Sequence, residues 1–429
     1  MKESKAISTT DTDALTGLLN REGFEKEVNA LRKAQPDTEF CIIYWNIKEF
    51  KIANILLGRE RCDWILKNIS NVFRKFSGQY PIVFGRIISD RFVCCIPKEL
   101  VEIIDWKNAT DIKTDIHGFE YHLHSNYGIY YITKETLSVD EMIMRAQIAM
   151  QTFSSPMTQS YAVYNQEMGD RAIRRNLLLG DFRRALESGQ FYPVYQPICD
   201  AGTGHVISVE VLTRWKHPVY GNIPPAEFFP LFEENGCIGE LDRYIWEKAC
   251  QTVRTSFEHS HKVVPFSINV SKVDFLASNL ADIIYDIVTE NGLNPEFIQI
   301  EVTESACTFS KENVQRTVQK LHDCGFKILM DDFGKECSSF EMLSELPIDI
   351  LKIDASFIQN HDKTKKDKVI MDTLVRLARE LELESVIEGV ETEEQARYVQ
   401  KIGGNYVQGY YYYKPMLDEQ ILHLLDASR

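Results

Sequence analysis

The second half of the chain alternates short β-rich runs with helical patterns, and this alternation restricts its fold more than any other feature. Eight apolar runs recur there, from FYPVYQPI at residue 191 to YVQGYYYY at residue 406. Amphipathic segments such as NVQRTVQKLHDCG separate most of them. Eight strands alternating with helices over roughly 240 residues predict a (β/α)8 barrel. The nearly continuous apolar strands agree, because parallel sheets are buried on both faces.

The first half has a different order of elements. Helical patterns, strands and a hairpin-like pair, VFGRIISDRFVCCIP, are mixed without a regular repeat. This order predicts an α+β domain over residues 10–165. A charged amphipathic helix over 166–190 is predicted to connect it to the barrel, which we place at 175–429.

Composition limits the class of protein. The chain has 429 residues, long enough for two domains that each bury a core. Its net charge of −15 argues against a general nucleic-acid binder, which would present a basic face. No apolar run approaches the roughly 18 residues of a membrane span, and the first residues contain no apolar core like that of a signal peptide. We therefore expect a cytoplasmic protein without a membrane span.

Polar residues stand late in the predicted barrel strands. In such barrels the carboxyl ends of the strands build the active site, so these residues are expected to meet at one mouth. They are Glu210, Arg214, Asn269, Glu301, Glu304, Asp331, Asp332, Lys352, Asp354, Glu388, Glu391 and Gln408. So many close acids cannot all stay ionised without cations. Oxygen ligands from Asp, Glu and Asn favour Mg²⁺ or Mn²⁺.

Two adjacent aspartates, Asp331 and Asp332, suit a pair of metal ions about 3.5–4 Å apart that promotes in-line displacement at phosphorus. Lys352 is placed to orient a water nucleophile, and Arg214 to hold a phosphate. Simpler roles stay open. Asp354 and Glu391 are also explained as residues that fix loops. Lys352 is also explained as a structural partner of Glu388.

The second half resembles the EAL domain, a barrel phosphodiesterase that linearises cyclic di-GMP. EVLTRW, INVS, EVTES, DDFG, LKID, EGVE and QGYYYYKP follow the order and spacing of the family motifs. The resemblance implies hydrolysis of cyclic di-GMP to pGpG with two Mg²⁺ or Mn²⁺ ions. It also implies a homodimer, because family barrels pair through helices near the loop after the fifth strand.

The resemblance also assigns roles to single residues. The implied metal ligands are Glu210, Asn269, Glu301, Asp331, Asp332 and Glu388. The implied catalytic residues are Lys352, Glu388, Asp332 and Gln408, with Lys352 orienting the water and Gln408 supporting it. The implied substrate-binding residues are Gln196, Leu212, Arg214 and Glu304, of which Glu304 also anchors the loop after the fifth strand.

One motif departs from the family. Directly after DDFG the family has Thr, Ser or Ala followed by Gly and Tyr, whereas this chain has Lys335, Glu336 and Cys337. A glutamate in place of the glycine disfavours a turn with positive φ by about 1 kcal/mol or more. The alternative function is therefore a cyclic di-GMP receptor that binds the nucleotide without hydrolysing it.

The first half resembles a GGDEF domain that has lost its signature. DALTGLLNR matches the start of the family, but RIISDRF replaces the signature, with Ile88 and Ser89 in place of the glycines. Asn46 stands where a metal-binding aspartate is expected, so we expect no diguanylate cyclase activity. Asn54 and Asp63 keep positions where the family reads guanine, which implies weak GTP binding. The alternative is that Asp63 caps or solvates its helix.

Overall fold

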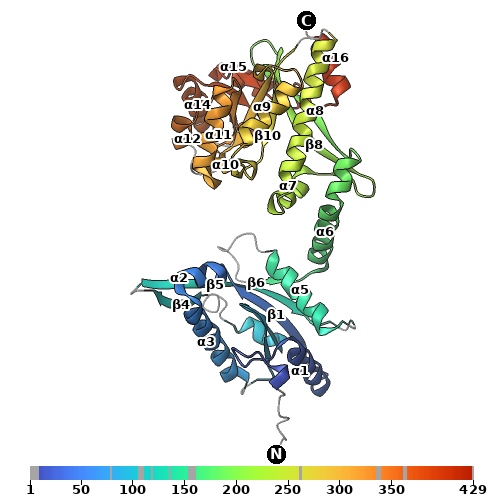
Figure 1. Ribbon diagram of the computed structural model, residues 1–429, viewed down its shortest axis with the longest axis vertical. Helices are drawn as coiled ribbons and strands as arrows, with labels where there is room; N and C mark the ends of the chain where they lie inside the picture. Colours follow the sequence, from blue (N-terminus) through green and yellow to red (C-terminus); the bar gives the residue numbers. More distant parts are fainter. Residues whose placement is uncertain are drawn as a thin grey trace, which may run out of the picture. The chain divides into compact units, whose positions relative to one another are not determined.

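The computed structural model describes residues 9–77, 80–104, 111–116, 119–133, 135, 137–152, 161–259, 263–334, 340–360 and 365–427. The chain divides into two compact units, Met1–Asn176 and Leu177–Arg429, which are described separately (Figure 1). Among the described residues, no helix combines the length and the apolar character that crossing a membrane requires.

The first unit is a sheet with helices on both faces, in the strand order β2-β3-β1-β5-β4. The strands are β1 (Phe40–Ile47), β2 (Val83–Ile88), β3 (Arg91–Pro97), β4 (Asp111–Ile116), β5 (Phe119–Tyr131) and β6 (Tyr161–Val163), which pairs with β5. The helices are η1 (Thr9–Asp11), α1 (Arg21–Ala34), α2 (Phe50–Leu57), α3 (Arg59–Ser77), η2 (Lys98–Glu102) and α5 (Val139–Gln151).

The central strand β1 explains the layers of this unit. Successive side chains of a strand point to opposite faces. On one face Ile43 and Trp45 join a buried cluster with α2 and α3, and on the other Ile42 and Tyr44 join a cluster with α1 and α5. An apolar strand between two helical layers therefore gives the predicted α+β domain.

The second unit is a closed barrel, as predicted. Its sheet order is β10-β11-β12-β13-β14-β15-β7-β8-β9, and a pairing of β10 with β8 closes it. The strands are β7 (Phe191–Asp200), β8 (Val206–His217), β9 (Gly221–Ile223), β10 (Phe266–Val270), β11 (Ile298–Thr303), β12 (Lys327–Phe333), β13 (Ile350–Ile353), β14 (Glu384–Ile387) and β15 (Tyr406–Val407). The pairings from β10 to β15 are parallel.

The first barrel strand differs from a uniformly parallel barrel. β7 runs antiparallel to both of its neighbours, β8 and β15. A tight turn over 201–205 joins β7 to β8, and the Asp200 carboxylate accepts hydrogen bonds from the backbone N–H groups of Gly202 and Thr203. A connection this short joins only antiparallel strands, since a parallel pair needs a long crossover.

Helices surround the barrel (Figure 1). They are α7 (Pro225–Glu234), α8 (Ile238–Glu258), η3 (Asp274–Leu276), α9 (Leu280–Glu290), η4 (Pro295–Phe297), α10 (Glu304–Phe309), α11 (Lys311–Asp323), α12 (Phe340–Glu345), α13 (Ala355–Asn360), α14 (Lys365–Glu380), α15 (Glu393–Ile402) and α16 (Asp418–Ala427). Helix α6 (Gln166–Glu187) precedes them and contains the boundary between the two units. The predicted connector at 166–190 corresponds to α6. The end of α6 is fixed to β8 by His217, whose Nε2 lies 2.9 Å from Asp181 Oδ2.

Candidate functional site

Four carboxylates surround one lysine ammonium group inside the barrel. Lys352 Nζ lies 2.9 Å from carboxylate oxygens of Glu301, Asp331 and Glu388, and 3.3 Å from Glu210 Oε2. The lysine side chain is 1% exposed. These residues come from β8, β11, β12, β13 and the end of β14, so closure of the barrel assembles the cluster. We call these five residues the Lys352 cluster.

The charges of the Lys352 cluster do not balance. Burial, reinforced by the charge of Glu210, raises the pKa of Glu301 well above its usual range. Burial also raises the pKa of Glu388 to about 8, although Lys352 acts in the opposite direction. Burial disfavours the charged lysine, but the carboxylates, led by Asp331, raise the pKa of Lys352 well above its usual value. The site therefore lacks positive charge.

The donor atoms of this site fit hard divalent cations. In the described part of the chain, no group of three acidic, histidine or cysteine side chains is arranged to hold a metal ion, and the Lys352 ammonium group lies among the acids of this site. Glu301 Oε1, however, is buried without a hydrogen-bond partner among the described residues. An all-oxygen set with excess negative charge and an unsatisfied buried carboxylate oxygen suits Mg²⁺ or Mn²⁺.

An irregularity in β12 lies at the two adjacent aspartates. The pairing of β12 with β13 shifts register between Met330 and Phe333. Asp332 has φ +57°, in the left-handed region that few residues other than glycine adopt. Adjacent residues of a regular strand point to opposite faces, whereas a bulge redirects a side chain. The irregularity thus frees Asp331 and Asp332 from regular alternation, at a cost of about 1–3 kcal/mol.

Two glutamines lie beside Glu210. Gln408 Nε2 donates a hydrogen bond of 2.6 Å to Glu210 Oε2. Gln196 pairs directly with Glu210 across β7 and β8, and its Nε2 donates to the Tyr413 carbonyl at 3.3 Å. Directly opposed residues in an antiparallel pair share a face of the sheet. Both glutamines therefore contribute to the surroundings of the Lys352 cluster.

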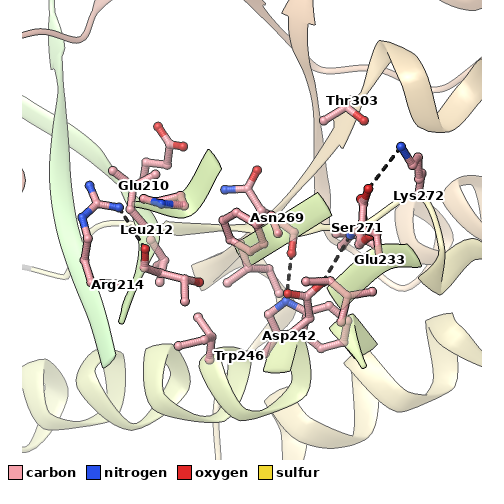
Figure 2. A pocket seen from close by; sticks show the side chains of 18 of the residues that line it. Glu210, Leu212, Arg214, Glu233, Asp242, Trp246, Asn269, Ser271, Lys272 and Thr303 are labelled. Carbon is pink, nitrogen blue, oxygen red and sulfur yellow. Dashed lines mark hydrogen bonds and ion pairs between the residues drawn. The ribbon is translucent and has the colours of Figure 1, made fainter. Parts of the chain in front are cut away.

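A cavity of about 370 Å³ begins at Glu210 and extends along β8 and β10 (Figure 2). Leu212, Arg214 and Asn269, which the sequence selected, line it. Arg214 Nη1 donates to the Thr213 backbone carbonyl at 2.9 Å. The backbone carbonyl of Asn269 accepts a 3.0 Å hydrogen bond from Trp246 Nε1, which leaves the Asn269 side chain out of this contact. Glu304 is buried at the start of α10 and is not among the residues that line this cavity.

The opposite wall of this cavity was not predicted from the sequence; it contains Glu233, Asp242, Ser271 and Lys272. Burial, reinforced by Asp274, raises the pKa of Asp242 well above its usual range, and the two carboxyl groups are hydrogen-bonded to each other. Burial also raises the pKa of Asp274. In the helical pattern ELDRYIW, Asp242 stands three and four residues before Ile245 and Trp246, so helical spacing places this acid on their apolar side of the helix.

The GGDEF-like positions of the first unit are changed in sequence, whereas the backbone at Ser89 keeps a glycine-like conformation. Ser89 keeps a positive φ of +52° in the turn between β2 and β3, where the family has glycine. Arg86 Nε donates to the Ser89 carbonyl at 2.7 Å, and Arg86 Nη1 binds Asp13 at 2.9 Å. Asn46 pairs with Arg91 across β1 and β3. The Arg86 side chain thus contacts the turn at Ser89, where the family has glycine.

The two positions expected to read guanine lie on α2 and α3. Asn54 Nδ2 donates to the Phe50 carbonyl of its own helix at 2.9 Å. Asp63 is half-buried within α3, which begins at Arg59, so the expectation that Asp63 caps its helix is wrong. Asp63 therefore lies one turn inside the helix. Lys335, Glu336 and Cys337 lie outside the described residues.

Comparisons with known proteins match both units. The family model for the EAL domain matches residues 179–415, and that for the diguanylate cyclase GGDEF domain matches residues 10–158. The chain is 30% identical over 418 residues to the bifunctional diguanylate cyclase/cyclic di-GMP phosphodiesterase MucR of Pseudomonas aeruginosa, covering 96% of this chain and 61% of that protein. It is 27% identical to the cyclic di-GMP phosphodiesterase NbdA of the same species, covering 97% of this chain and 54% of NbdA.

A solved structure extends the comparison to the barrel. The PaMucR phosphodiesterase in complex with c-di-GMP is 36% identical, with a TM-score of 0.55, and the match covers 57% of this chain and all of that one. The chain thus spans only about half to three-fifths of the length of the two curated relatives.

Replacing Lys352 with methionine tests the charge balance of the cluster. The variant keeps a long side chain but leaves four buried carboxylates without their shared cation. We expect the metal-free protein to lose roughly 3–5 kcal/mol of unfolding free energy. Mn²⁺ is expected to raise the melting temperature of both proteins, and more in the variant. Lys401→Met, at an exposed position on α15, is the control. A melting temperature unaffected by Mn²⁺ in both proteins would contradict the metal site.

The Asp242–Asp274 pair predicts a pH dependence of stability. Asp242 holds its proton in the folded state, whereas an unfolded aspartate releases it near pH 4. The folded state therefore binds more protons, and wild-type stability falls as pH rises above about 4. The Asp242→Asn variant has no proton to lose at this position. The difference between its unfolding free energy and that of wild type should therefore increase in favour of the variant as pH rises, by at most about 1.4 kcal/mol per pH unit.

Urea unfolding of the full chain between pH 5 and pH 8 measures this difference. The exposed Asp286→Asn variant on α9 serves as the control and should follow wild type. A constant difference between Asp242→Asn and wild type would show that Asp242 is ionised in the folded protein.

Proposed function

This chain belongs to the EAL domain family and carries a GGDEF domain before its barrel, and we propose that the barrel hydrolyses cyclic di-GMP to pGpG. The observation that carries the proposal is the Lys352 cluster, in which residues far apart in sequence supply a buried, oxygen-rich and negatively charged site. The relatives MucR and NbdA, whose names describe cyclic di-GMP phosphodiesterases, support the choice of substrate.

We assign two Mg²⁺ or Mn²⁺ ions to this site. Their ligands are Glu210, Asn269, Glu301, Asp331, Asp332 and Glu388. When bound, the ions supply electrostatic stabilisation of the attacking and leaving oxygens at phosphorus. Gln408 holds the Glu210 carboxylate in place through its 2.6 Å hydrogen bond. Lys352 contributes a fixed ammonium donor that orients the nucleophilic water.

The remaining residues position the substrate. Arg214 holds a phosphate, Leu212 lies beside it on the cavity wall, and Gln196 contacts the nucleotide next to Glu210. Glu304 acts through the loop after the fifth strand. Water attacks phosphorus in line with the 3′-oxygen, which leaves, and the product keeps a 5′-phosphate as pGpG. The proposal includes a homodimer of this barrel.

Turnover of cyclic di-GMP tests the proposal. Full-length protein with Mg²⁺ or Mn²⁺ should release pGpG, detected by chromatography. Because Arg214 is assigned to the phosphate, Arg214→Ala should lower kcat/KM by at least about tenfold, the loss of one charge-assisted contact. The exposed Arg397→Ala on α15 should leave it unchanged. Absence of pGpG at saturating nucleotide with either metal would rule out hydrolysis.

A second function, a receptor that binds cyclic di-GMP without hydrolysing it, rests on Lys335, Glu336 and Cys337. Tight binding of intact nucleotide would favour it. In that case, replacing the three residues with Thr-Gly-Tyr should restore turnover and locate the fault in this segment. If the replacement restores nothing, the fault lies elsewhere.

For the first domain we propose the absence of cyclase activity. Asn46 removes a metal ligand, and Arg86 engages the turn at Ser89. GTP incubated with Mg²⁺ should yield no cyclic di-GMP, and Ser89→Gly alone should not restore synthesis. Weak GTP binding through Asn54 and Asp63 is tested by calorimetry of wild type and Asp63→Ala. Heat-silent titrations at millimolar GTP would contradict it.

A further inference from the structure

The cavity has two chemically different ends. At one end Glu210 and Asn269 belong to the assigned metal site, with Arg214 on the same wall. At the other end stand Glu233, Ser271 and Lys272, which take no part in the proposed chemistry (Figure 2). Apolar residues also line the cavity, including Phe229, Ile238, Ile245 and Trp246. Such a surface suits the flat face of a base better than a phosphate.

The polar end is ordered by direct contacts. Lys272 Nζ lies 3.1 Å from Glu233 Oε2, and Ser271 Oγ donates to Glu233 Oε1 at 2.9 Å. The Ser271 backbone N–H points to Asp242 Oδ2 at 3.4 Å. The side chains of Lys272 and Glu233 are 36% and 23% exposed, so both remain accessible from the cavity. A cation and a carboxylate thus stand side by side on this wall.

This end is unsuited to a phosphate group. Glu233 neutralises Lys272, and Asp242 adds a second acidic group, so an anion would meet carboxyl groups rather than excess positive charge. A nucleobase edge needs a hydrogen-bond donor and an acceptor side by side on the protein, because the edge itself presents an acceptor next to a donor. Guanine offers the O6 acceptor beside the N1–H donor, and adenine offers the N6–H₂ donor beside the N1 acceptor.

We propose that Lys272 is a specificity-determining residue that donates a hydrogen bond to O6 of a substrate guanine, while Glu233 accepts from its N1–H. Lysine has three N–H donors, so Lys272 keeps Glu233 while it binds O6. An adenine in the same place would set N6–H₂ against the ammonium group and N1 against the carboxylate. This inference rests on the proposed function and names the base that the site selects.

Comparison of cyclic di-GMP with cyclic di-AMP tests the role. In Lys272→Met, kcat/KM for cyclic di-GMP should fall at least about tenfold while that for cyclic di-AMP stays within about twofold, so the preference for guanine decreases. Lys272→Arg, which keeps a cationic donor, should retain most of the preference. Lys216→Met, at an exposed lysine on β8, should leave both values unchanged.

The outcomes separate this inference from the proposed function. If wild type binds but does not hydrolyse cyclic di-GMP, the proposed hydrolysis fails, and the ratio of the two Kd values tests Lys272 in the same variants. An equal loss for both nucleotides in Lys272→Met would identify a phosphate contact and overturn the inference. Unchanged values for both would also overturn it. The melting temperature of each variant shows whether the fold is retained.

Discussion

The contacts of Lys352 with four carboxylates are the interaction on which the barrel depends. Each of these charges would be costly to bury alone, because a charge taken out of water needs a partner within hydrogen-bonding distance. The partners come from strands separated by up to 178 residues of sequence (210 to 388), so they meet only when every strand has its native register. A one-residue slip of a strand would reverse the direction of its side chains and leave a buried charge unpaired. The cluster therefore favours the native register of these strands.

Backbone strain occurs in both units, with different consequences. Asp332 and Ser89 both have positive φ values, at +57° and +52°. In the barrel, the strained residue lies at a register shift beside the Lys352 cluster, where redirecting a carboxylate serves the site. In the first unit, the turn keeps the conformation of a glycine turn, although its carbonyl now binds Arg86. The positive φ is therefore present there although Ile88 and Ser89 stand where the family has glycines.

Much of the barrel was predictable because its strands are apolar runs with polar residues late in each. That pattern led to Glu301, Asp331, Lys352 and Glu388, which the structure brings together. The antiparallel direction of β7 was not predictable from periodicity, since the pattern of apolar residues in a strand does not determine whether its neighbours run parallel or antiparallel to it. The irregularity at Asp332 depends on pairing with β13, which no local pattern encodes. Asp242 was missed because an acid within a helical pattern normally faces water.

One corner of the barrel connects both ends of the cavity. Asn269 on β10 lies at the assigned metal site, and Ser271, two residues later, belongs to the wall with Lys272. Trp246 on α8 donates a hydrogen bond to the backbone carbonyl of Asn269. One turn earlier on the same helix, Asp242 accepts a hydrogen bond from the backbone N–H of Ser271. Helix α8 therefore holds β10 at two successive points. Because these two contacts join β10 to α8, a displacement of either element would move the proposed metal site and the proposed base-reading wall together.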